Sequence, residues 1–207
     1  MKTKELETLI SFSRKYYENG WMLATAGNLS IFDSENQTIT ITASGKDKGN
    51  LREEDFITVS LSDLKPTKET NNRPSAETSI HQAIYKTQKN ARAVLHVHTP
   101  SSCILEYKLS SNEEKKYITL PNTEILKAFG DFREEPNFKM LVVHNYTNVP
   151  KIASILEEEL LKENLELPFF LIENHGLTVW GNSVYEANKF LEATEFVMNV
   201  MVQRYKI

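Results

Sequence analysis

Ala-Val-Leu-His-Val-His-Thr-Pro (93–100) is the most informative segment of the chain. It is short, apolar and rich in β-branched residues, which is typical of a buried strand. Side chains two residues apart on a strand point to the same face, so His96 and His98 are expected to converge on one point. Two imidazoles that converge in this way can bind a divalent metal. The alternative is that both are structural, but burying a second imidazole without a partner is costly.

A third histidine, His175, lies in Ile-Glu-Asn-His-Gly (172–176), directly after the apolar segment Leu-Pro-Phe-Phe-Leu (167–171). The chain has five histidines, and three of them fall at or near the ends of predicted strands. Two ligands from one strand and a third from a loop would make an open three-histidine zinc site with a free position for substrate. The other two histidines lack such neighbours and are predicted to be structural or exposed: His81, on a helix, and His144, at the end of a strand.

The composition is that of a single globular domain spanning residues 1–207, with 40% hydrophobic and 25% charged residues. The net charge is −4 and there is no basic block, which argues against nucleic acid as a partner. No apolar stretch approaches the roughly 20 residues needed to span a bilayer, and the first residues lack the apolar core of a signal peptide. No membrane partner is therefore expected.

Cys103 is the only cysteine, so an internal disulfide is excluded and a cytoplasmic location is favoured. It follows the His-x-His strand within a predicted helix. We expect it to pack in the core, and a thiol ligand to the metal is the alternative.

Hydrophobic periodicity predicts strands and helices along the chain. The first helix ends at Asn19-Gly20, and segments 29–32 and 38–42 look like an antiparallel hairpin. Ser75 is expected to cap a helix at about 76–88. These elements predict a mixed sheet covered by helices on both faces. No G-x-G-x-x-G motif follows the first strand, so a doubly wound nucleotide fold is not predicted. Further strands are predicted at 56–61, 117–120, 140–143, 168–173 and 177–180, and further helices after Pro100 and at 123–129, 150–163 and 184–205.

Three segments have the chemistry of a phosphate site: Thr-Ala-Gly-Asn (25–28), Thr-Ala-Ser-Gly-Lys (42–46) and Pro-Ser-Ala-Glu (74–77). Glycines let the backbone come close, and hydroxyls and exposed amides bind phosphate oxygens. Ser75-Ala76 also opens the predicted helix, where free N–H groups favour an anion, and Lys46 adds positive charge. Taken singly, each segment is better explained as an ordinary turn or helix cap.

Two carboxylates, Glu77 and Glu124, are each expected in the first turn of a helix. A carboxylate there commonly balances the helix dipole or caps the helix. On composition alone, neither is a candidate catalytic residue.

Taken together, these pieces resemble the class II aldolase/adducin family over nearly the whole chain. The resemblance rests on Thr-Ala-Gly-Asn-Leu-Ser (25–30), Thr-Ala-Ser-Gly (42–45), Pro-Ser-Ala-Glu (74–77), Leu-His-Val-His-Thr (95–99) and Asn-His-Gly (174–176). It implies an α/β fold with three α/β/α layers around a mostly antiparallel mixed sheet. It also implies that Zn²⁺ is bound by His96, His98 and His175. The residues that it implies for the phosphate of a small sugar-phosphate substrate are Gly27, Asn28, Ser44, Gly45, Ser75 and Ala76, next to Lys46.

Within this family, segments 43–48, 118–130 and 173–181 are closest to a branch that dehydrates a ketose phosphate. That resemblance implies dehydration of 5-methylthioribulose 1-phosphate to 2,3-diketo-5-methylthiopentyl 1-phosphate in methionine salvage. Glu124 matches the general acid/base of that branch, although Pro121-Asn122 beside it departs from the usual residues. Glu77 matches the acid/base of the aldolase branch. A second carboxylate favours dehydration, because expelling the C4 hydroxyl requires an acid near it.

Two other functions stay open on the sequence. One is an aldolase or epimerase acting on another sugar phosphate, and the other is a non-catalytic assembly module of the adducin kind. The resemblance also implies a homo-oligomer, commonly a cyclic tetramer with active sites near subunit contacts. The last predicted helix gives this weak support through aromatic and methionine residues that equally suit a core: Phe190, Phe196, Met198, Met201 and Tyr205.

Overall fold

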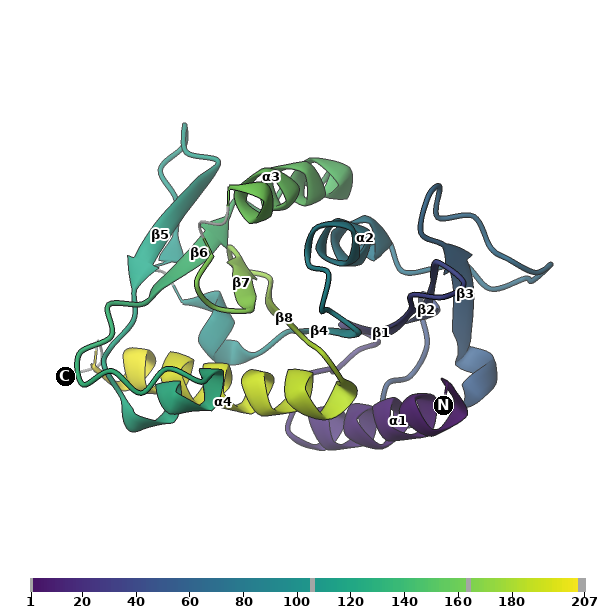
Figure 1. Cartoon of the computed structure of the whole chain (residues 1–207), viewed down its shortest axis with the longest axis horizontal. Coiled ribbons are helices and arrows are strands. Elements are labelled where there is room, and N and C mark those ends of the chain that lie inside the picture. The colour runs from purple at the N-terminus through teal and green to yellow at the C-terminus, as the bar shows by residue number, and fades with distance from the viewer. Residues whose placement is uncertain (1, 105–106, 163–164, 205–207) are drawn as a thin grey trace.

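An eight-stranded sheet runs through the computed structural model of the protein, and helices lie on both of its faces (Figure 1). The structure describes residues 2–104, 107–162 and 165–204. The strand order is β3-β2-β1-β4-β8-β7-β6-β5, so the strand that carries His96 lies near the centre. The strands are β1 (Asn28–Asp33), β2 (Thr38–Thr42), β3 (Phe56–Ser60), β4 (Ala93–Val97), β5 (Lys115–Thr119), β6 (Lys139–Val143), β7 (Phe169–Ile172) and β8 (Gly176–Gly181).

Neighbouring strands of this sheet are antiparallel, apart from the parallel pair β6 and β7. A parallel pair requires a crossover, and α3 (Val149–Leu161) provides it. β1 and β2 form the predicted hairpin, whose turn is held by Asp33 Oδ1 accepting the N–H groups of Glu35 and Asn36 at 3.1 Å. The prediction of a mostly antiparallel mixed sheet is confirmed.

Strand alternation divides the core into two layers. Helices α2 (Thr78–Thr87) and α3 cover one face, and α1 (Lys2–Glu18) and α4 (Val184–Arg204) cover the other (Figure 1). On β4, Leu95 and Val97 pack with α1 and α4, whereas Val94 packs with α2 and α3. Burying a side chain of this kind contributes roughly 1.5–3 kcal/mol, so the register of β4 is strongly fixed. His96 shares the face of Val94 and therefore points toward α2. The three-layer α/β/α prediction is confirmed.

The start of α2 differs from the prediction. The helix begins at Thr78 with Glu77 at the N-cap position, so the prediction that Ser75 caps a helix from Ala76 is wrong. Ser75 lies in a preceding turn, where its carbonyl accepts the Thr78 N–H at 3.1 Å and the Thr78 hydroxyl at 2.6 Å. The residue at the N-cap position is consequently a glutamate, whose side chain makes no capping hydrogen bond to the helix.

Two other predicted helices are short 3₁₀ helices, η2 (Pro100–Cys103) and η4 (Glu124–Phe129). In η2 the side chain of Thr99 accepts the Ser102 N–H and a proline occupies the first turn, which suits a single tight turn. The predicted helix ends at Glu163 and Tyr205 lie outside the described residues. Within the described ranges, no helix combines the length and the apolar character needed to cross a bilayer.

Candidate functional site

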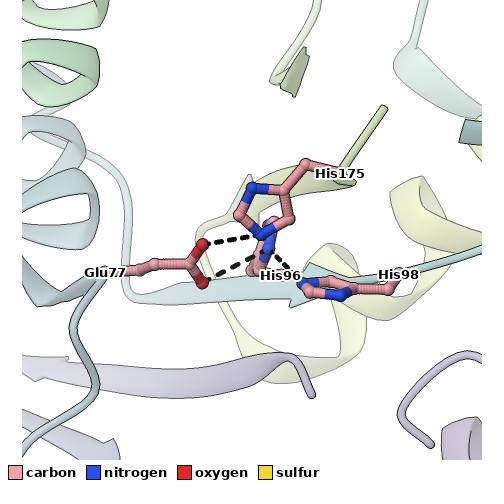
Figure 2. A group of neighbouring side chains, drawn as sticks. All are labelled: Glu77, His96, His98 and His175. Atoms are coloured by element: carbon pink, nitrogen blue, oxygen red, sulfur yellow. Dashed lines mark hydrogen bonds and ion pairs between the residues drawn. The ribbon is translucent and has the colours of Figure 1, made fainter. Parts of the chain in front are cut away.

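Three histidines meet at the end of β4 (Figure 2). His96 lies on β4, His98 directly follows it, and His175 lies in the turn between β7 and the adjacent β8. The Nε2 atoms of His96 and His98 are 3.0 Å apart, and the His175 ring centroid is 5.1 Å and 4.6 Å from those of His96 and His98. With Glu77 they offer ligand atoms that all lie within 4.8 Å of one another. The structure thus brings together the three histidines predicted to bind a metal.

Two further side chains fix the orientation of the imidazole rings. His96 Nδ1 lies 2.9 Å from the hydroxyl of Thr178 on β8, and His175 Nδ1 lies 3.2 Å from Asn145 Oδ1. In the tautomer in which His175 Nδ1 donates to Asn145 Oδ1, Nε2 has its lone pair free for a cation. A partner that holds Nδ1 in this way orients a metal-binding histidine and raises its basicity.

Glu77 completes the cluster from the N-cap of α2. Its Oε1 lies 2.9 Å from His175 Nε2 and its Oε2 lies 3.3 Å from His96 Nε2 (Figure 2). The side-chain amide of Asn28 donates to the same Oε2, while Asn28 Oδ1 lies 2.6 Å from His81 Nε2. A buried polar chain therefore links the core to the carboxylate.

The electrostatics of the cluster suit a cation. Burial lowers the pKa of His96 and lowers that of His98 to about 3, so both rings are neutral, which is the form that binds metals. Burial alone would raise the pKa of Glu77, but His96, His175 and the Asn28 amide hold it well below its usual range. The site thus presents neutral nitrogens and an ionised carboxylate.

Gly176 is required by the packing of this cluster. A Cβ atom at this position would lie 2.5 Å from the Val97 carbonyl oxygen, 2.8 Å from His96 Cε1 and 2.9 Å from His98 Cδ2. Only glycine lets β8 approach the two histidines so closely. The Asn-His-Gly motif therefore carries a packing residue as well as a ligand.

An open cleft of about 650 Å³ adjoins the histidines. Cys103 is exposed and lines it, so the prediction that this cysteine packs in the core is wrong. The reason is that η2 stops at Cys103, which leaves the side chain at the mouth of the site instead of within a longer helix. The cleft is lined by Gly20, Leu23, Ala26, His98, Thr99, Pro100, Cys103, Asn145, Asn174 and His175.

The three predicted phosphate segments also lie together beside the cluster. The Ser44 N–H donates to the Arg73 carbonyl at 2.9 Å, which holds segment 42–46 against segment 74–77. The contact between Asn28 and Glu77 joins segment 25–28 to the same place. Segments far apart in sequence therefore lie together next to the histidines.

Comparison with known proteins identifies the family. The family described as "Class II Aldolase and Adducin N-terminal domain" matches residues 7–202. The chain belongs to this family. The methylthioribulose-1-phosphate dehydratase of Leptospira biflexa serovar Patoc is 45% identical over 202 residues, covering 96% of this chain and 97% of the relative. The enzyme of that name from Microcystis aeruginosa is 40% identical over 201 residues, covering 97% and 96%. The family membership of this chain is thus established over nearly its full length.

A solved structure supports the fold. The L-fuculose-1-phosphate aldolase of Thermus thermophilus superposes with a TM-score of 0.75 at 20% identity, covering 99% of this chain and 97% of the aldolase. At this identity the likeness concerns the fold alone. It agrees with the class II aldolase architecture predicted from the sequence motifs.

Within this class II aldolase-like domain, some predicted phosphate residues face inward. A Cβ at Gly27, where φ is +75°, would lie 2.8 Å from the His96 carbonyl oxygen, so this glycine packs against the metal-binding strand. Asn28 is buried with its amide engaged by Glu77 and His81. Lys46 pairs with Asp55 at 3.0 Å, so a carboxylate already balances the positive charge that was predicted to attract the phosphate.

The remaining members of the set face solvent. Ser44, Gly45 and Ala76 are exposed, and Ser75 is half-buried. Gly45 has a φ of +73°, and a Cβ there would meet no atom within 4 Å. The N–H groups of Gly45 and Lys46 have no hydrogen-bond partner in the part of the chain that the structure describes. These donors are available to an anion.

Glu124 lies apart from this cluster. Its side chain on η4 is 84% exposed and pairs with Lys127 at 2.8 Å, and it does not line the cleft. It borders an apolar hollow formed with Ile125, Ala128, Phe196 and Val200. The structure therefore places the predicted acid/base Glu124 outside the histidine cluster and the cleft beside it.

The sequence patterns do not point to Thr178 and Asn145. These residues contact the histidines only because β8 and the end of β6 lie beside them, which no local pattern indicates. The other two histidines are as predicted: His81 is buried and structural, and His144 is 42% exposed and pairs with Glu173.

Proposed function

We propose that this chain catalyses the dehydration of 5-methylthioribulose 1-phosphate to 2,3-diketo-5-methylthiopentyl 1-phosphate in methionine salvage, as a cytoplasmic enzyme. The proposal is carried by the cluster of His96, His98, His175 and Glu77 at an open cleft, with the phosphate segments beside it. It is supported by relatives of that name that are 40–45% identical over nearly the whole chain.

The metal of the cluster is Zn²⁺ in this proposal. Three imidazoles fit the donor set of a catalytic zinc site, and Glu77 adds a carboxylate at the same point. When bound, zinc supplies Lewis acidity to the carbonyl of the substrate. Thr178 and Asn145 would keep the rings in the orientation that this binding needs.

The reaction removes the C3 proton and the C4 hydroxyl, which leave together as water, and the resulting enol rearranges to the diketone. Glu77 is ionised and lies among the ligand atoms, so it is placed to hold a proton or to support the metal. Glu124 is the proposed principal general acid/base, which takes the C3 proton and returns a proton to the departing hydroxyl.

Glu124 reaches a cleft in this scheme only if a second copy of the chain presents it. Support comes from its exposed position on η4 and from the apolar side chains around it, where Phe196 is 52% and Ile125 is 36% exposed. Phe190, Met198 and Met201 are buried in the core, so they do not support a contact between subunits. Tyr205 lies outside the described residues. We propose a homo-oligomer, most simply a tetramer.

The phosphate binds, in this proposal, over segments 25–28, 42–46 and 74–77. The exposed donors are the Ser44 hydroxyl and the N–H groups of Gly45 and Lys46, with the Ser75 turn beside them. Gly27, Asn28 and Ala76 shape this surface. Consecutive backbone N–H groups near a left-handed glycine form a concavity that favours anions.

One observation favours a second candidate, an aldolase or epimerase acting on another sugar phosphate. Glu77, the residue matching the aldolase acid/base, lies 2.9 Å from His175 within the cluster. An aldolase acting on the same ketose would break C3–C4 and release dihydroxyacetone phosphate with methylthioacetaldehyde.

Mass spectrometry of the products from 5-methylthioribulose 1-phosphate separates the two functions. Dehydration is expected to give one product lighter than the substrate by one water, with no dihydroxyacetone phosphate. Cleavage products would move the chain to the aldolase branch. An unchanged substrate with zinc-loaded protein would contradict the proposed dehydration.

A further inference from the structure

Lys48 is a buried cation beside the phosphate segments. It is 2% exposed, and no other lysine or arginine is buried among the residues whose exposure the structure describes, 4–104, 107–162 and 165–204. Its Nζ donates to the carbonyls of Thr25 at 2.7 Å and Lys46 at 2.9 Å. No carboxylate of the described residues forms an ion pair with it. Asp47 and Asp55 attract this ammonium without pairing with it, and burial still lowers the pKa of Lys48 to about 8, which calls for an explanation.

The acidic residues near Lys48 are engaged elsewhere. Asp55 pairs with Lys46 at 3.0 Å. Asp47 accepts the N–H of Gly49 at 3.0 Å and the side-chain amide of Asn50 at 2.7 Å. The charge of Lys46 is therefore balanced, whereas that of Lys48 is available to another anion.

The position of Lys48 ties two loops together. The Thr25 carbonyl belongs to a turn in which Ala24 and Thr25 both adopt positive φ, of 51° and 66°. Such conformations cost free energy in residues other than glycine and persist only where the surroundings enforce them. The Lys46 carbonyl belongs to the loop that carries the free N–H groups of Gly45 and Lys46. The ammonium thus sets the spacing between segments 25–28 and 42–46.

The backbone of Lys48 is held by a hydrogen bond, and its positive charge affects a histidine of the cluster. The hydroxyl of Ser13 on α1 donates to the Lys48 carbonyl at 2.6 Å, which holds the residue against the helix. Burial is the main cause of the lowered pKa of His98, and the positive charge of Lys48 lowers it further. The charge of Lys48 is therefore close enough to the histidines to affect His98.

We propose that Lys48 is the cation of the phosphate site, a positioning residue that holds the 25–28 and 42–46 loops at the spacing of a phosphate group and supplies the positive charge that favours its dianion. This inference rests on the proposed function, which puts a phosphate ester there. It assigns to Lys48 the role that the sequence suggested for Lys46. Burial of the charge strengthens its effect, because solvent screens it less than it screens the ion pair at the surface.

Lys48→Met tests this, with Lys65→Met as the control, because Lys65 is an exposed lysine outside the phosphate segments that pairs with Asp63 at 3.1 Å. In Lys48→Met we expect KM for 5-methylthioribulose 1-phosphate and Kd for inorganic phosphate to rise about tenfold or more, the effect of one charge-assisted interaction. kcat and zinc content should stay within about threefold of wild type, and Lys48→Arg should recover most of the phosphate affinity. Lys65→Met should change Kd by less than about threefold, as expected for a surface ion pair. Equal phosphate affinity in the two methionine variants would overturn the inference.

Amide hydrogen exchange of the wild-type protein keeps the inference testable if Lys48→Met fails to fold. Inorganic phosphate should slow exchange in segments 24–28 and 44–48, and slowing confined to other segments would overturn the inference. Neither phosphate measurement depends on turnover. If the wild type binds phosphate through these loops but yields no diketone, the proposed function fails while the assignment of Lys48 stands.

Discussion

His96 Nε2 lies 3.0 Å from His98 Nε2, within hydrogen-bond distance. Two neutral rings can make this contact only if one of these nitrogens carries the proton. His96 Nδ1 lies 2.9 Å from the Thr178 hydroxyl. When the proton of the His96 ring is on Nδ1, this hydroxyl accepts the hydrogen bond and Nε2 is left unprotonated. The pair is therefore held so that both Nε2 lone pairs can be directed at one cation, which is the basis of the predictions below.

The first prediction concerns metal loading. Wild-type protein is expected to hold about one zinc per subunit, and His98→Ala to lose most of it, because a catalytic site of three histidines has no ligand to spare. His144→Ala is the matched control, since this histidine is 42% exposed and pairs with Glu173 outside the cluster. Elemental analysis of dialysed protein gives the stoichiometry. Full zinc content in His98→Ala would rule out the site.

The second prediction concerns Gly176. In Gly176→Ala the new methyl group would overlap the Val97 carbonyl and both histidine rings, so the ligands must shift. Overpacking of this kind typically costs about 1–3 kcal/mol, which in a chain of this size lowers Tm by roughly 2–4 °C per kcal/mol. We expect a fall in both Tm and zinc content. Gly130→Ala, where a Cβ would meet no atom but φ is +87°, should lower Tm alone. Normal zinc affinity in Gly176→Ala would contradict the packing argument.

Much of the fold follows from local sequence. The alternation in 38–42 and the apolar run in 93–97 predict strands, because these patterns match the period of a pleated strand. The same period places His96 and His98 on one face, so this part of the site is predictable too. Ser75 is a misprediction for a physical reason: a good capping residue lies three positions before the helix, and the turn at 75–78 uses its carbonyl instead.

Other parts of the site depend on long-range packing. Lys48 and Thr25 are 23 positions apart, and their contact exists only because the loops before β1 and after β2 meet. His96 and Thr178 are 82 positions apart and meet through the pairing of β4 with β8. No periodicity encodes such contacts. The solvent-exposed place of Glu124 on η4 likewise follows from how η4 packs on α4, which its own sequence does not reveal.

The third prediction concerns acid sensitivity. Burial lowers the pKa of His81 from 6.5 to about 3 in the folded chain, so the unfolded chain binds one more proton between these values. The stability that His81 contributes is complete above about pH 6.5 and falls by about 1.4 kcal/mol per pH unit toward pH 3. From about pH 7 to about pH 5 the wild type should therefore lose about 2 kcal/mol more than His81→Gln does. Urea unfolding of both proteins with a chelator present measures the difference. Equal losses would show that His81 does not stay neutral.

The last prediction is that Glu124 carries the acid/base chemistry although it lies outside the cleft of its own subunit. Glu124→Gln keeps the size and polarity of the side chain but removes its ability to exchange a proton. Loss of a general acid/base typically lowers the rate about 10²–10⁴-fold, and kcat for dehydration should fall accordingly while zinc content and subunit assembly stay intact. Glu77→Gln should lower dehydration less, because its carboxylate supports the metal cluster in this scheme.

Glu158→Gln is the matched control for Glu124, since Glu158 is also an exposed carboxylate, 59% accessible, that pairs with a lysine in the next turn. Its kcat should equal that of wild type. If a second copy of the chain delivers Glu124 to the cleft, mixing Glu124→Gln with His98→Ala subunits should restore activity, because some sites then combine an intact glutamate with intact histidines. Light scattering that gives the 23.8 kDa monomer mass for active enzyme would exclude this delivery. Near-normal kcat in zinc-loaded Glu124→Gln, or a larger loss in Glu77→Gln, would transfer the acid/base role to Glu77 and favour the aldolase arrangement.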